Sequence, residues 1–305
     1  MNFQKNVPLS TFSNYGIGGP AKFFINLQKK EELKEIDFSK FKHVFVLGGG
    51  TNVLIPDKGF NNLVILNNIK GVQLKDNELY LGAGELISDI LYFCIQNSLS
   101  GLEWAGGLPG TIGGAVRGNA GAFNGEIKDS ILCVQSFNIR TKKITERNNE
   151  QCEFGYRMSF YKKNPDEIIT KVVLKLKKGD KKEIKRLTQE KIDYRNLKHP
   201  MDYPNIGSTF KNIPLNSVND NLKNEFAPFI KKDPFPVVAT TKLLALAGLK
   251  GKSEGGAQIS EKHPNFIINL GNAKASDVLK LIKLMKKTIK DKWGITLEEE
   301  IQILK

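Results

Sequence analysis

The sequence contains few of the residues that build disulfides and metal centres. Its 305 residues include only three cysteines and three histidines. Cys94, Cys133 and Cys152 show no CxxC spacing, so the sequence supports neither a disulfide framework nor a cysteine zinc site. No HExxH motif and no cluster of histidine with aspartate is present, which argues against a metal hydrolase. Any redox chemistry would therefore depend on an organic cofactor.

Long apolar runs are also missing. The stretch 43–56 (HVFVLGGGTNVLIP) is too short to span a membrane and has three glycines in its middle. The N-terminal segment MNFQKNVPLSTFSNYG lacks the apolar core of a secretory signal. We expect a soluble, cytoplasmic protein with no membrane insertion.

Positive charge is in excess, with 46 Lys and Arg against 32 Asp and Glu and a formal net charge of +14. The lysines are spread along the chain, and runs such as 175–187 lie beside apolar residues at strand or helix spacing, which is typical of solvated faces. We expect no nucleic-acid partner. A hydrophobic fraction of 40% excludes global disorder and suffices for about two or three domains.

Short apolar runs predict a mixed α and β fold. Helical spacing is found over 86–97, 181–195 and 240–247. A further helix is expected to be capped by Ser276 and to carry Val278, Ile282, Met285 and Ile289 on one stripe. Prolines 200 and 204 indicate a boundary near 200, followed by a smaller α+β unit. Strands are expected at 44–47, 53–55, 63–66, 72–74, 79–81, 131–139, 168–176 and 265–270.

Glycines are concentrated in two places. Nine of the 28 lie between residues 101 and 125, and three more form GGGTN at 48–52. Together with GLPGTIGGAV at 107–116, these stretches favour turns whose backbone amides converge on an anion, such as the pyrophosphate of a cofactor. Neither stretch matches GxxxxGK or GxGxxG, so a P-loop and a standard Rossmann domain are both excluded.

Eight segments in series give a more specific indication. They are GIGGPA (16–21), LGGGTNVLIPDKGF (47–60), GLEWAGGLPGTIGGAVRGNAGAFNGE (101–126), FGYRMSFY (154–161), GSTFKN (207–212), AGLKGKSEGGAQIS (247–260), KHPNFIIN (262–269) and GITLEEEIQIL (294–304). Through these segments the chain resembles the UDP-N-acetylenolpyruvoylglucosamine reductase family along nearly its whole length. The short spacing from Ser208 to the C-terminus resembles the shorter subtype, which lacks an extra tyrosine-bearing loop.

The resemblance implies an α+β fold of the vanillyl-alcohol-oxidase type, with two FAD-binding subdomains and a C-terminal α+β substrate-binding domain. In this sequence we expect the subdomains at 1–67 and 68–200 and the substrate domain at 201–305, whose last strand can return to the FAD region. The cofactor-binding residues implied are Gly48, Gly49, Gly50, Thr51, Asn52, Val53, Gly110, Thr111, Gly113, Gly114 and Ala115.

The activity implied is a step of peptidoglycan synthesis for the bacterial cell wall. NADPH, as co-substrate, gives a hydride to FAD, and the hydride then reduces the enolpyruvyl group of UDP-N-acetylglucosamine enolpyruvate, yielding UDP-N-acetylmuramate. Hydride delivery to the β carbon generates an enolate, which needs a cation beside its carboxylate and a proton donor at the α carbon. The matched positions supply Arg157 for the enolate, Ser208 for the proton and Glu300 in support of either.

The substrate-binding residues implied are Tyr156, Lys198, Lys211 and Asn212, with the lysines suited to an anionic diphosphate. Lys198 is equally well explained as a solvated lysine, because His199 replaces the glutamine usual before the proline. Strand alternation puts Glu298 and Glu300 on one face, so periodicity does not choose between them. The roles of His263 and Asn265 stay open.

Two other functions compete with the reductase. An oxidase of the same fold would share the glycine stretches but would not need Arg157, Ser208 and a terminal glutamate as a set. A nucleic-acid-binding protein would explain the charge but not the glycines, and it predicts clustered arginines with stacking aromatics, which the sequence lacks. The oligomeric state is not determined by the sequence, although a monomer is favoured.

Overall fold

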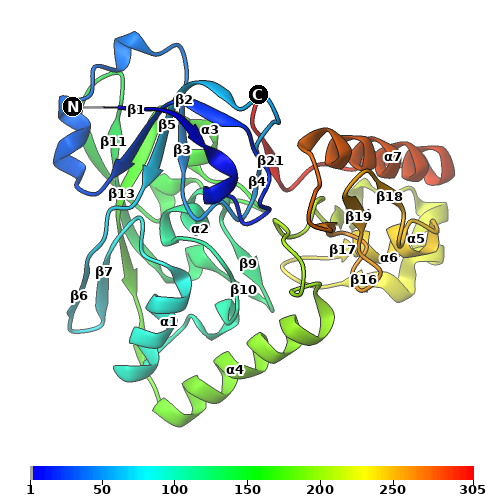
Figure 1. Ribbon diagram of the computed structural model, residues 1–305. Coiled ribbons are helices and arrows are strands. Elements are labelled where there is room, and N and C mark those ends of the chain that lie inside the picture. The colour runs from blue at the N-terminus through cyan, green and yellow to red at the C-terminus, as the bar shows by residue number, and fades with distance from the viewer. Residues whose placement is uncertain (1–2) are drawn as a thin grey trace. The chain divides into compact units, whose positions relative to one another are not determined.

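The computed structural model describes residues 3–305, which form two compact units (Figure 1). Unit 1 comprises residues up to 7, 21–49 and 60–193, and unit 2 comprises 8–20, 50–59 and 194–305. Each unit is therefore assembled from separate stretches of the chain. The fold class predicted from the sequence, α+β, is confirmed in both units.

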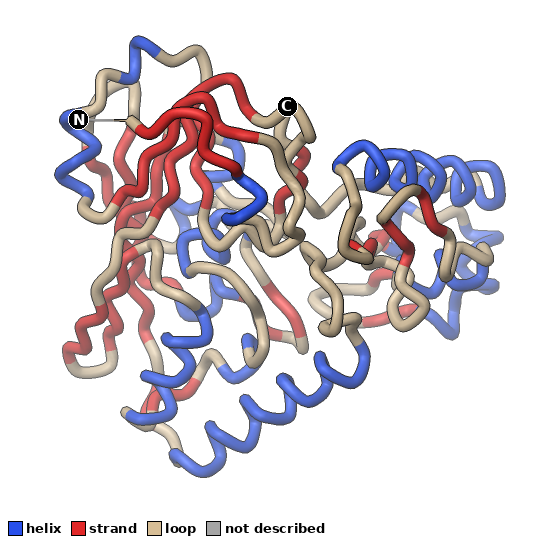
Figure 2. The backbone as a smooth tube through the Cα atoms, viewed as in Figure 1, coloured by secondary structure: helices blue, strands red, loops and turns tan. Residues whose placement is uncertain are grey.

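Unit 1 contains two larger sheets, seen as the grouped red strands of Figure 2. The first has the order β1 (Gln4–Pro8), β2 (Pro20–Leu27), β5 (Phe60–Asn67), β3 (Val44–Leu47). Its β5 is paired in parallel on both sides, which explains the uninterrupted apolar run Leu63 to Ile65, fully buried. The second has the order β12 (Ile144–Asn148), β11 (Ile131–Asn138), β13 (Glu167–Lys175), β7 (Glu78–Gly82), β6 (Val72–Lys75), with every pairing antiparallel.

Helices α1 (Ile87–Gln96) and α2 (Ile112–Gly118) pack on the second sheet of unit 1 through one hydrophobic cluster. It joins Ile87 and Ile90 of α1, and Val116 of α2, to Leu81 and Val172 of the sheet. The remaining elements that begin in unit 1 are β8 (Leu99–Ser100), β9 (Gly121–Ala122), β10 (Gly125–Glu126), α3 (Phe160–Lys163), β14 (Lys177–Lys178) and α4 (Lys181–Lys198).

Unit 2 is built from short strands and three helices around a core of its own. The strands are β4 (Val53–Leu54), β15 (Ile213–Pro214), β16 (Ile230–Lys231), β17 (Val237–Val238), β18 (Ser253–Glu254), β19 (Ala257–Ile259), β20 (Ile267–Asn269) and β21 (Gln302–Ile303), and the helices are α5 (Asp220–Phe226), α6 (Thr240–Leu246) and α7 (Ala275–Trp293). The last strand, β21, pairs in parallel with β4. The predicted stripe of α7 is confirmed, since all four of its apolar residues are buried.

The N-terminus of α7 differs from the expectation. The helix begins at Ala275, and its first N–H groups, those of Ala275 and Ser276, donate to the carboxylate of Asp57 at 2.7 and 3.0 Å. Although burial opposes ionisation, these hydrogen bonds lower the pKa of Asp57. The prediction that Ser276 caps the helix is therefore wrong, because a carboxylate from a distant stretch of unit 2 satisfies the same donors.

Within residues 3–305, no helix is both long enough and apolar enough to cross a bilayer. The same residues contain no group of three His, Cys, Asp or Glu side chains arranged to hold a metal ion.

Candidate active site

The two glycine stretches of the sequence meet in unit 1. A Cβ atom added to Gly49 would lie 2.7 Å from the Cα of Gly110, and one added to Gly48 would lie 2.6 Å from the Oγ1 of Thr111. Real Cβ atoms do not approach other heavy atoms so closely, so these positions accept only glycine without movement of the loops. The structure thus brings together predicted cofactor-binding residues that are separated by some sixty positions in the sequence.

Thr111 organises the second loop. Its hydroxyl accepts a hydrogen bond from the Gly114 N–H at 3.3 Å and caps α2. Gly113 donates to the Ala83 carbonyl at 2.9 Å, and Ala115 is buried. Thr111 also faces Leu86 in an antiparallel bridge whose hydrogen bonds are made by the flanking residues, so the Thr111 N–H points away from that bridge. The bridge to Leu86 therefore does not use this N–H.

The rest of the first stretch, residues 50–52, belongs to unit 2, as does Val53 directly after it. Gly50 has φ +64°, and an added Cβ would lie 1.9 Å from the Phe12 carbonyl oxygen. The Asn52 side chain donates to the Glu300 carbonyl at 3.3 Å. The backbone carbonyl of Asn52 accepts a hydrogen bond from the Gln302 N–H at 2.9 Å. Hence Asn52 and Val53 are held against the segment that carries the predicted glutamate. Thr51 is half-buried beside them.

Arg157 lies in a tight turn of unit 1. Gly155 and Met158 exchange two backbone hydrogen bonds, of 3.0 and 3.1 Å, and Arg157 between them has φ +54°. One guanidinium nitrogen donates to the Gly121 carbonyl at 2.8 Å. The guanidinium carbon lies 5.3 Å from the ring centroid of Tyr156, within the range of a cation–π contact. The side chain is therefore fixed in direction.

Ser208 lies in unit 2 and is half-buried. The two residues that follow it are hydrogen-bonded to Asn265. The Thr209 N–H donates to the Asn265 carbonyl at 2.7 Å, and the Asn265 amide bonds both the N–H and the carbonyl of Phe210, at 3.0 and 2.8 Å. Gly207, with φ +82°, sets the direction of the chain before the serine. The sequence left the role of Asn265 open, and these contacts show that it immobilises the backbone that follows Ser208.

The three consecutive glutamates have different surroundings. Phe210 and Glu299 form an antiparallel bridge, so Glu298 and Glu300 point to the face opposite Glu299. Glu299 pairs with Lys286 at 2.8 Å, whereas the largely exposed Glu298 pairs with Lys211. Glu300 is half-buried, and its N–H donates to the Thr209 carbonyl at 2.8 Å, one residue from Ser208.

The predicted substrate-binding residues lie in both units, with Tyr156 in unit 1 and the others in unit 2. Lys211 has only 10% of its side chain exposed, and Asn212 follows it and accepts a hydrogen bond from the Thr240 N–H at 3.2 Å. Lys198 is exposed at the end of α4. The structure therefore groups Lys211 and Asn212 in one segment with Ser208.

His199 and His263 form an aromatic cluster with Phe266 in unit 2, with the two imidazole centroids 5.2 Å apart. Burial, with the nearby charges of Arg195, Lys262 and Lys231, lowers the pKa of His199 to about 4. Burial, His199 and Lys231 lower the pKa of His263 to about 3. Both rings are therefore neutral at neutral pH.

This cluster predicts a loss of stability in acid. Below the ordinary histidine pKa of about 6.5, the unfolded chain binds protons that the folded chain does not, so the free energy of unfolding falls as the pH drops from about 6.5 towards about 4. The slope expected is on the order of 1 kcal/mol per pH unit for each histidine. Denaturant unfolding at several pH values measures it. His263→Gln should flatten the slope, whereas His43→Gln, at an exposed histidine, should leave it unchanged; equal slopes in wild type and His263→Gln would contradict the assignment.

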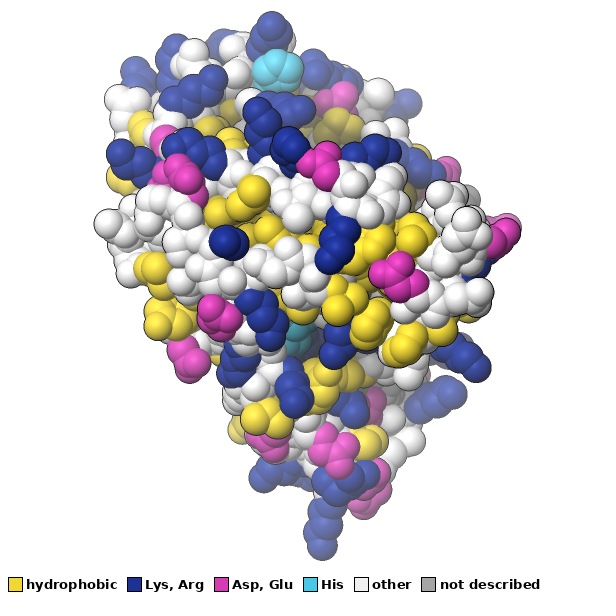
Figure 3. Space-filling view, turned by 90° about the vertical axis from the view of Figure 1, so that its right-hand side faces the viewer, with side chains coloured by type: hydrophobic (Ala, Val, Ile, Leu, Met, Phe, Trp, Pro, Cys, Tyr) yellow, Lys and Arg dark blue, Asp and Glu magenta, His cyan; other side chains and the backbone are white. Residues whose placement is uncertain are grey.

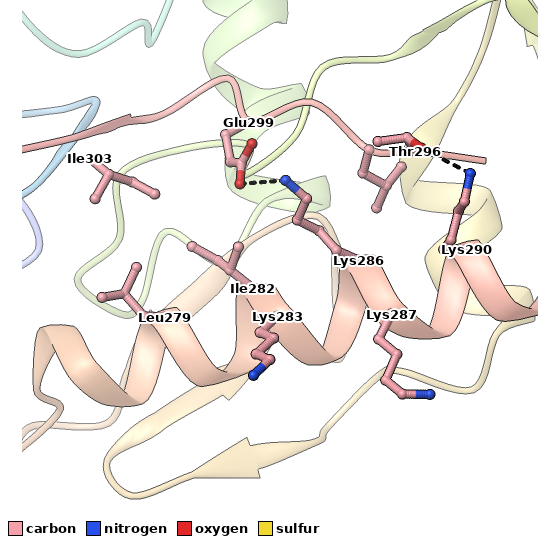
Figure 4. A pocket seen from close by; sticks show the side chains of 10 residues that line it. Leu279, Ile282, Lys283, Lys286, Lys287, Lys290, Thr296, Glu299 and Ile303 are labelled. Carbon is pink, nitrogen blue, oxygen red and sulfur yellow. Dashed lines mark hydrogen bonds and ion pairs between the residues drawn. The ribbon is translucent and has the colours of Figure 1, made fainter. Parts of the chain in front are cut away.

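A groove of about 490 Å³ runs along α7 (Figure 4). Apolar side chains including Leu279, Ile282 and Ile303 lie beside lysines that include Lys283 and Lys286. Glu299 lines it, but Ser208, Glu300 and Lys211 do not. The groove is therefore not part of the candidate active site.

Figure 3 shows one face of the molecule, on which Lys and Arg side chains are spread among acidic, polar and hydrophobic ones. On this face the positive charge does not form one continuous patch.

Three residues that the sequence analysis did not assign to the site form hydrogen bonds with the backbone at or near Ser208 and Arg157. Asn265 holds the segment after Ser208, Asn119 donates to the Gly155 carbonyl, and Lys162 donates to the Arg157 carbonyl. Asparagine in a glycine-rich stretch, as in GNAG at 118–121, is a weak signal for a left-handed turn residue, and Asn119 has φ +42°. The other two carry no such signal.

Comparison with known proteins gives matches over nearly the whole chain. Residues 25–141 match a family described as an FAD binding domain, and residues 199–304 match the family described as UDP-N-acetylenolpyruvoylglucosamine reductase, C-terminal domain. A UDP-N-acetylenolpyruvoylglucosamine reductase of Lactobacillus delbrueckii subsp. bulgaricus is 36% identical over 310 residues, covering 100% of this chain and 96% of the relative. The corresponding reductase of Lachnoclostridium phytofermentans is 37% identical, covering 98% of this chain and 92% of the relative.

A solved structure agrees with these matches. The crystal structure of UDP-N-acetylenolpyruvylglucosamine reductase from Thermus caldophilus superposes with a TM-score of 0.80 at 32% sequence identity, covering 100% of both chains. The fold expected from the sequence, an FAD-binding part followed by a C-terminal α+β domain, is confirmed by this likeness and by the two family matches.

Proposed function

Because this chain belongs to the UDP-N-acetylenolpyruvoylglucosamine reductase family, we propose that Arg157, Ser208 and Glu300 carry out its reduction step. The protein is an FAD-dependent oxidoreductase of peptidoglycan synthesis, with NADPH as co-substrate, that converts UDP-N-acetylglucosamine enolpyruvate to UDP-N-acetylmuramate. The observation that carries this conclusion is the identity of 36% across the full length of the chain.

The residues present fit the cofactor. Gly48 and Gly49 approach Thr111 and Gly110 too closely for a side chain at either glycine, and Gly49 is exposed, so its backbone is accessible to a ligand. The Thr111 N–H points away from its bridge and suits a diphosphate oxygen. We propose that these loops, with Thr51, Asn52 and Gly114, bind FAD. A bound FAD would supply the redox chemistry there, namely the transfer of a hydride from NADPH to the β carbon of the substrate.

Arg157 is proposed to bind the carboxylate of the enolpyruvyl group. Its planar guanidinium can form two parallel hydrogen bonds to a carboxylate, and these strengthen as the carboxylate takes up negative charge in the enolate. The hydrogen bond to Gly121 and the cation–π contact with Tyr156 hold the group in one orientation. Such a fixed donor stabilises developing charge with little reorganisation during the reaction.

Ser208 is proposed to transfer its hydroxyl proton to the α carbon. The new C–H bond forms from the enolate electron pair, and the serine oxygen takes the charge until it is reprotonated. Glu300, whose backbone is bonded to Thr209, is the proposed partner for this transfer or for Arg157. Glu300 is half-buried, and its N–H bonds the residue that directly follows Ser208, which supports the choice of Glu300.

The substrate diphosphate is proposed to bind beside Ser208, at Lys211 and Asn212, with Lys198 and Tyr156 as further contacts. Lys211 is paired with Glu298, whose side chain is 71% exposed. An exposed carboxylate holds a lysine weakly, so a diphosphate with a higher charge can replace it.

Three functional parts of the chain are proposed: residues 1–67 and 68–200 for FAD binding, and residues 201–305 for substrate binding. The proposed form of the protein is a cytoplasmic monomer.

Product analysis tests the function. The purified protein, supplied with FAD, NADPH and UDP-N-acetylglucosamine enolpyruvate, should consume NADPH and form a product heavier by two hydrogen atoms. Leaving out the UDP-sugar should limit NADPH consumption under anaerobic conditions to one equivalent per flavin, because the reduced flavin then has no acceptor. An unchanged sugar mass, or NADPH consumption that depends on oxygen alone, would contradict the reductase.

The glycine loops predict a matched pair of alanine variants. In Gly49→Ala, the new Cβ meets the Gly110 backbone, and overpacking of about 1–3 kcal/mol should weaken FAD binding roughly tenfold to a hundredfold. Gly118→Ala, in the last position of α2, meets nothing within 4 Å and should instead stabilise the protein by about 0.5–1 kcal/mol. Flavin fluorescence titration and thermal unfolding measure the two effects. Equal FAD affinity in Gly49→Ala and wild type would exclude this loop from the cofactor site.

A further inference from the structure

Arg157 has a backbone conformation that a residue with a side chain rarely adopts. Its φ of +54° lies in the left-handed region, which costs on the order of 1 kcal/mol or more and persists only where the surroundings impose it. The turn itself provides two hydrogen bonds between Gly155 and Met158. The remaining support comes from outside the turn.

Two side chains reach the turn from other elements of unit 1. The ammonium of Lys162, in α3, donates to the Arg157 carbonyl at 2.9 Å. The amide of Asn119 donates to the Gly155 carbonyl at 2.9 Å. That carbonyl also accepts the Met158 N–H, so Asn119 bonds to the atom that closes the turn.

Asn119 is fully buried, and both ends of its amide are occupied. The nitrogen also donates to a Glu126 carboxylate oxygen at 3.1 Å, and the oxygen accepts from the Lys128 N–H at 3.3 Å. Glu126 belongs to β10, the strand paired with β9, where the Gly121 carbonyl receives the Arg157 guanidinium. The Asn119 amide thus connects the Gly155–Met158 turn, which contains Arg157, to the β9–β10 hairpin, which orients the Arg157 side chain.

Asn119 also connects Arg157 to the proposed FAD loop. It caps the C-terminal end of α2 in the left-handed conformation, and Thr111 of that loop caps the N-terminal end. The helix has only seven residues, so its two ends are joined by a short rigid element. A displacement of the Arg157 turn relative to the loop therefore requires the Asn119 contacts to break.

We infer that Asn119 is a positioning residue for the reduction step, which fixes the Arg157 guanidinium relative to the cofactor loop through the Gly155–Met158 turn. The inference rests on the proposed function, because it assigns Asn119 to the step in which Arg157 acts. It predicts that loss of the Asn119 side chain affects enolate formation selectively, and that the effect passes through Arg157.

The test uses the FAD-loaded protein and Asn119→Gly. Glycine keeps the left-handed backbone and removes only the amide. Stopped-flow spectroscopy under anaerobic conditions measures flavin reduction by NADPH and reoxidation by the enolpyruvyl UDP-sugar separately. Reoxidation should slow about tenfold to a hundredfold, since misplacement of a catalytic group has such effects, while reduction stays unchanged. Asn6→Gly, the same substitution at an exposed residue with φ +54°, should change neither rate.

A double-mutant cycle distinguishes positioning from general damage. In an Arg157→Ala background, Asn119→Gly should cause no further loss of the reoxidation rate. Equal losses in both backgrounds, or equal losses in both half-reactions, would overturn the inference. If Asn119→Gly does not fold, Lys162→Met removes the second support from the other side of the turn and should show the same coupling. If the wild-type flavin is not reoxidised by the sugar at all, the proposed function fails instead.

Discussion

Replacing Ser208 by alanine is expected to slow reoxidation of the reduced flavin by the enolpyruvyl substrate by about 10²- to 10⁴-fold, the usual contribution of a positioned proton donor. Alanine removes the hydroxyl that is proposed to protonate the α carbon. Reduction of the flavin by NADPH needs no such proton and should proceed at the wild-type rate. Anaerobic stopped-flow absorbance follows the two half-reactions in succession.

The structure indicates that Ser208→Ala should remove the hydroxyl without moving the backbone around it. Ser208 is half-buried, and the backbone after it is held by Asn265, which bonds residues 209 and 210 whatever the side chain at 208. Ser217→Ala is a matched control, because that exposed hydroxyl donates only to the nearby Pro214 carbonyl at 2.7 Å. Unimpaired reoxidation in Ser208→Ala would remove this serine from the mechanism.

Arg157→Lys is expected to lower the rate of the same half-reaction by about 10²- to 10³-fold, the cost of losing one oriented donor to developing negative charge. Lysine keeps the positive charge. Its ammonium is a point charge and lacks the planar arrangement of donors in a guanidinium. It cannot make both the hydrogen bond to the Gly121 carbonyl and a bidentate contact with a carboxylate. The rate of reoxidation at saturating substrate is the measurement.

The control for this variant is Arg140→Lys. Arg140 makes an exposed ion pair with Asp166 at 3.1 Å in the same unit, so the substitution repeats the chemical change outside the site. It should leave both half-reactions unchanged, as exposed pairs contribute little. If Arg157→Lys retained the wild-type rate, the positive charge alone would be sufficient, and the argument from the planar group would be wrong.

The spacing of apolar residues in the sequence predicted those helices and strands that bury a regular set of apolar side chains. The stripe of α7 and the apolar centre of β5 follow from spacings of 3.6 residues and from burial on both faces of a parallel strand, which are local properties of the sequence. The two glycine stretches were also recognisable, because clustered glycines indicate turns or close approach of the backbone to a neighbour. Their contact through Gly49 and Gly110 was an expectation that only the folded chain could test.

Side-chain hydrogen bonds between distant segments could not be predicted. The carboxylate that caps α7 comes from Asp57, over two hundred positions away, and nothing near Ser276 indicates it. The amides of Asn119 and Asn265 act in the same way, each bonding to the backbone of another segment. Likewise, alternation left Glu298 and Glu300 equivalent, whereas in the folded chain Glu298 is largely exposed and paired with Lys211, and Glu300 is half-buried.

The most direct test of the central claim is the visible absorption spectrum of the FAD-loaded protein through two anaerobic additions. NADPH should bleach the flavin, and UDP-N-acetylglucosamine enolpyruvate, added next without oxygen, should restore its colour. This result would show that electrons pass from NADPH through the flavin to the enolpyruvyl group. A flavin that stays bleached after the UDP-sugar and regains its colour only with oxygen would contradict the account.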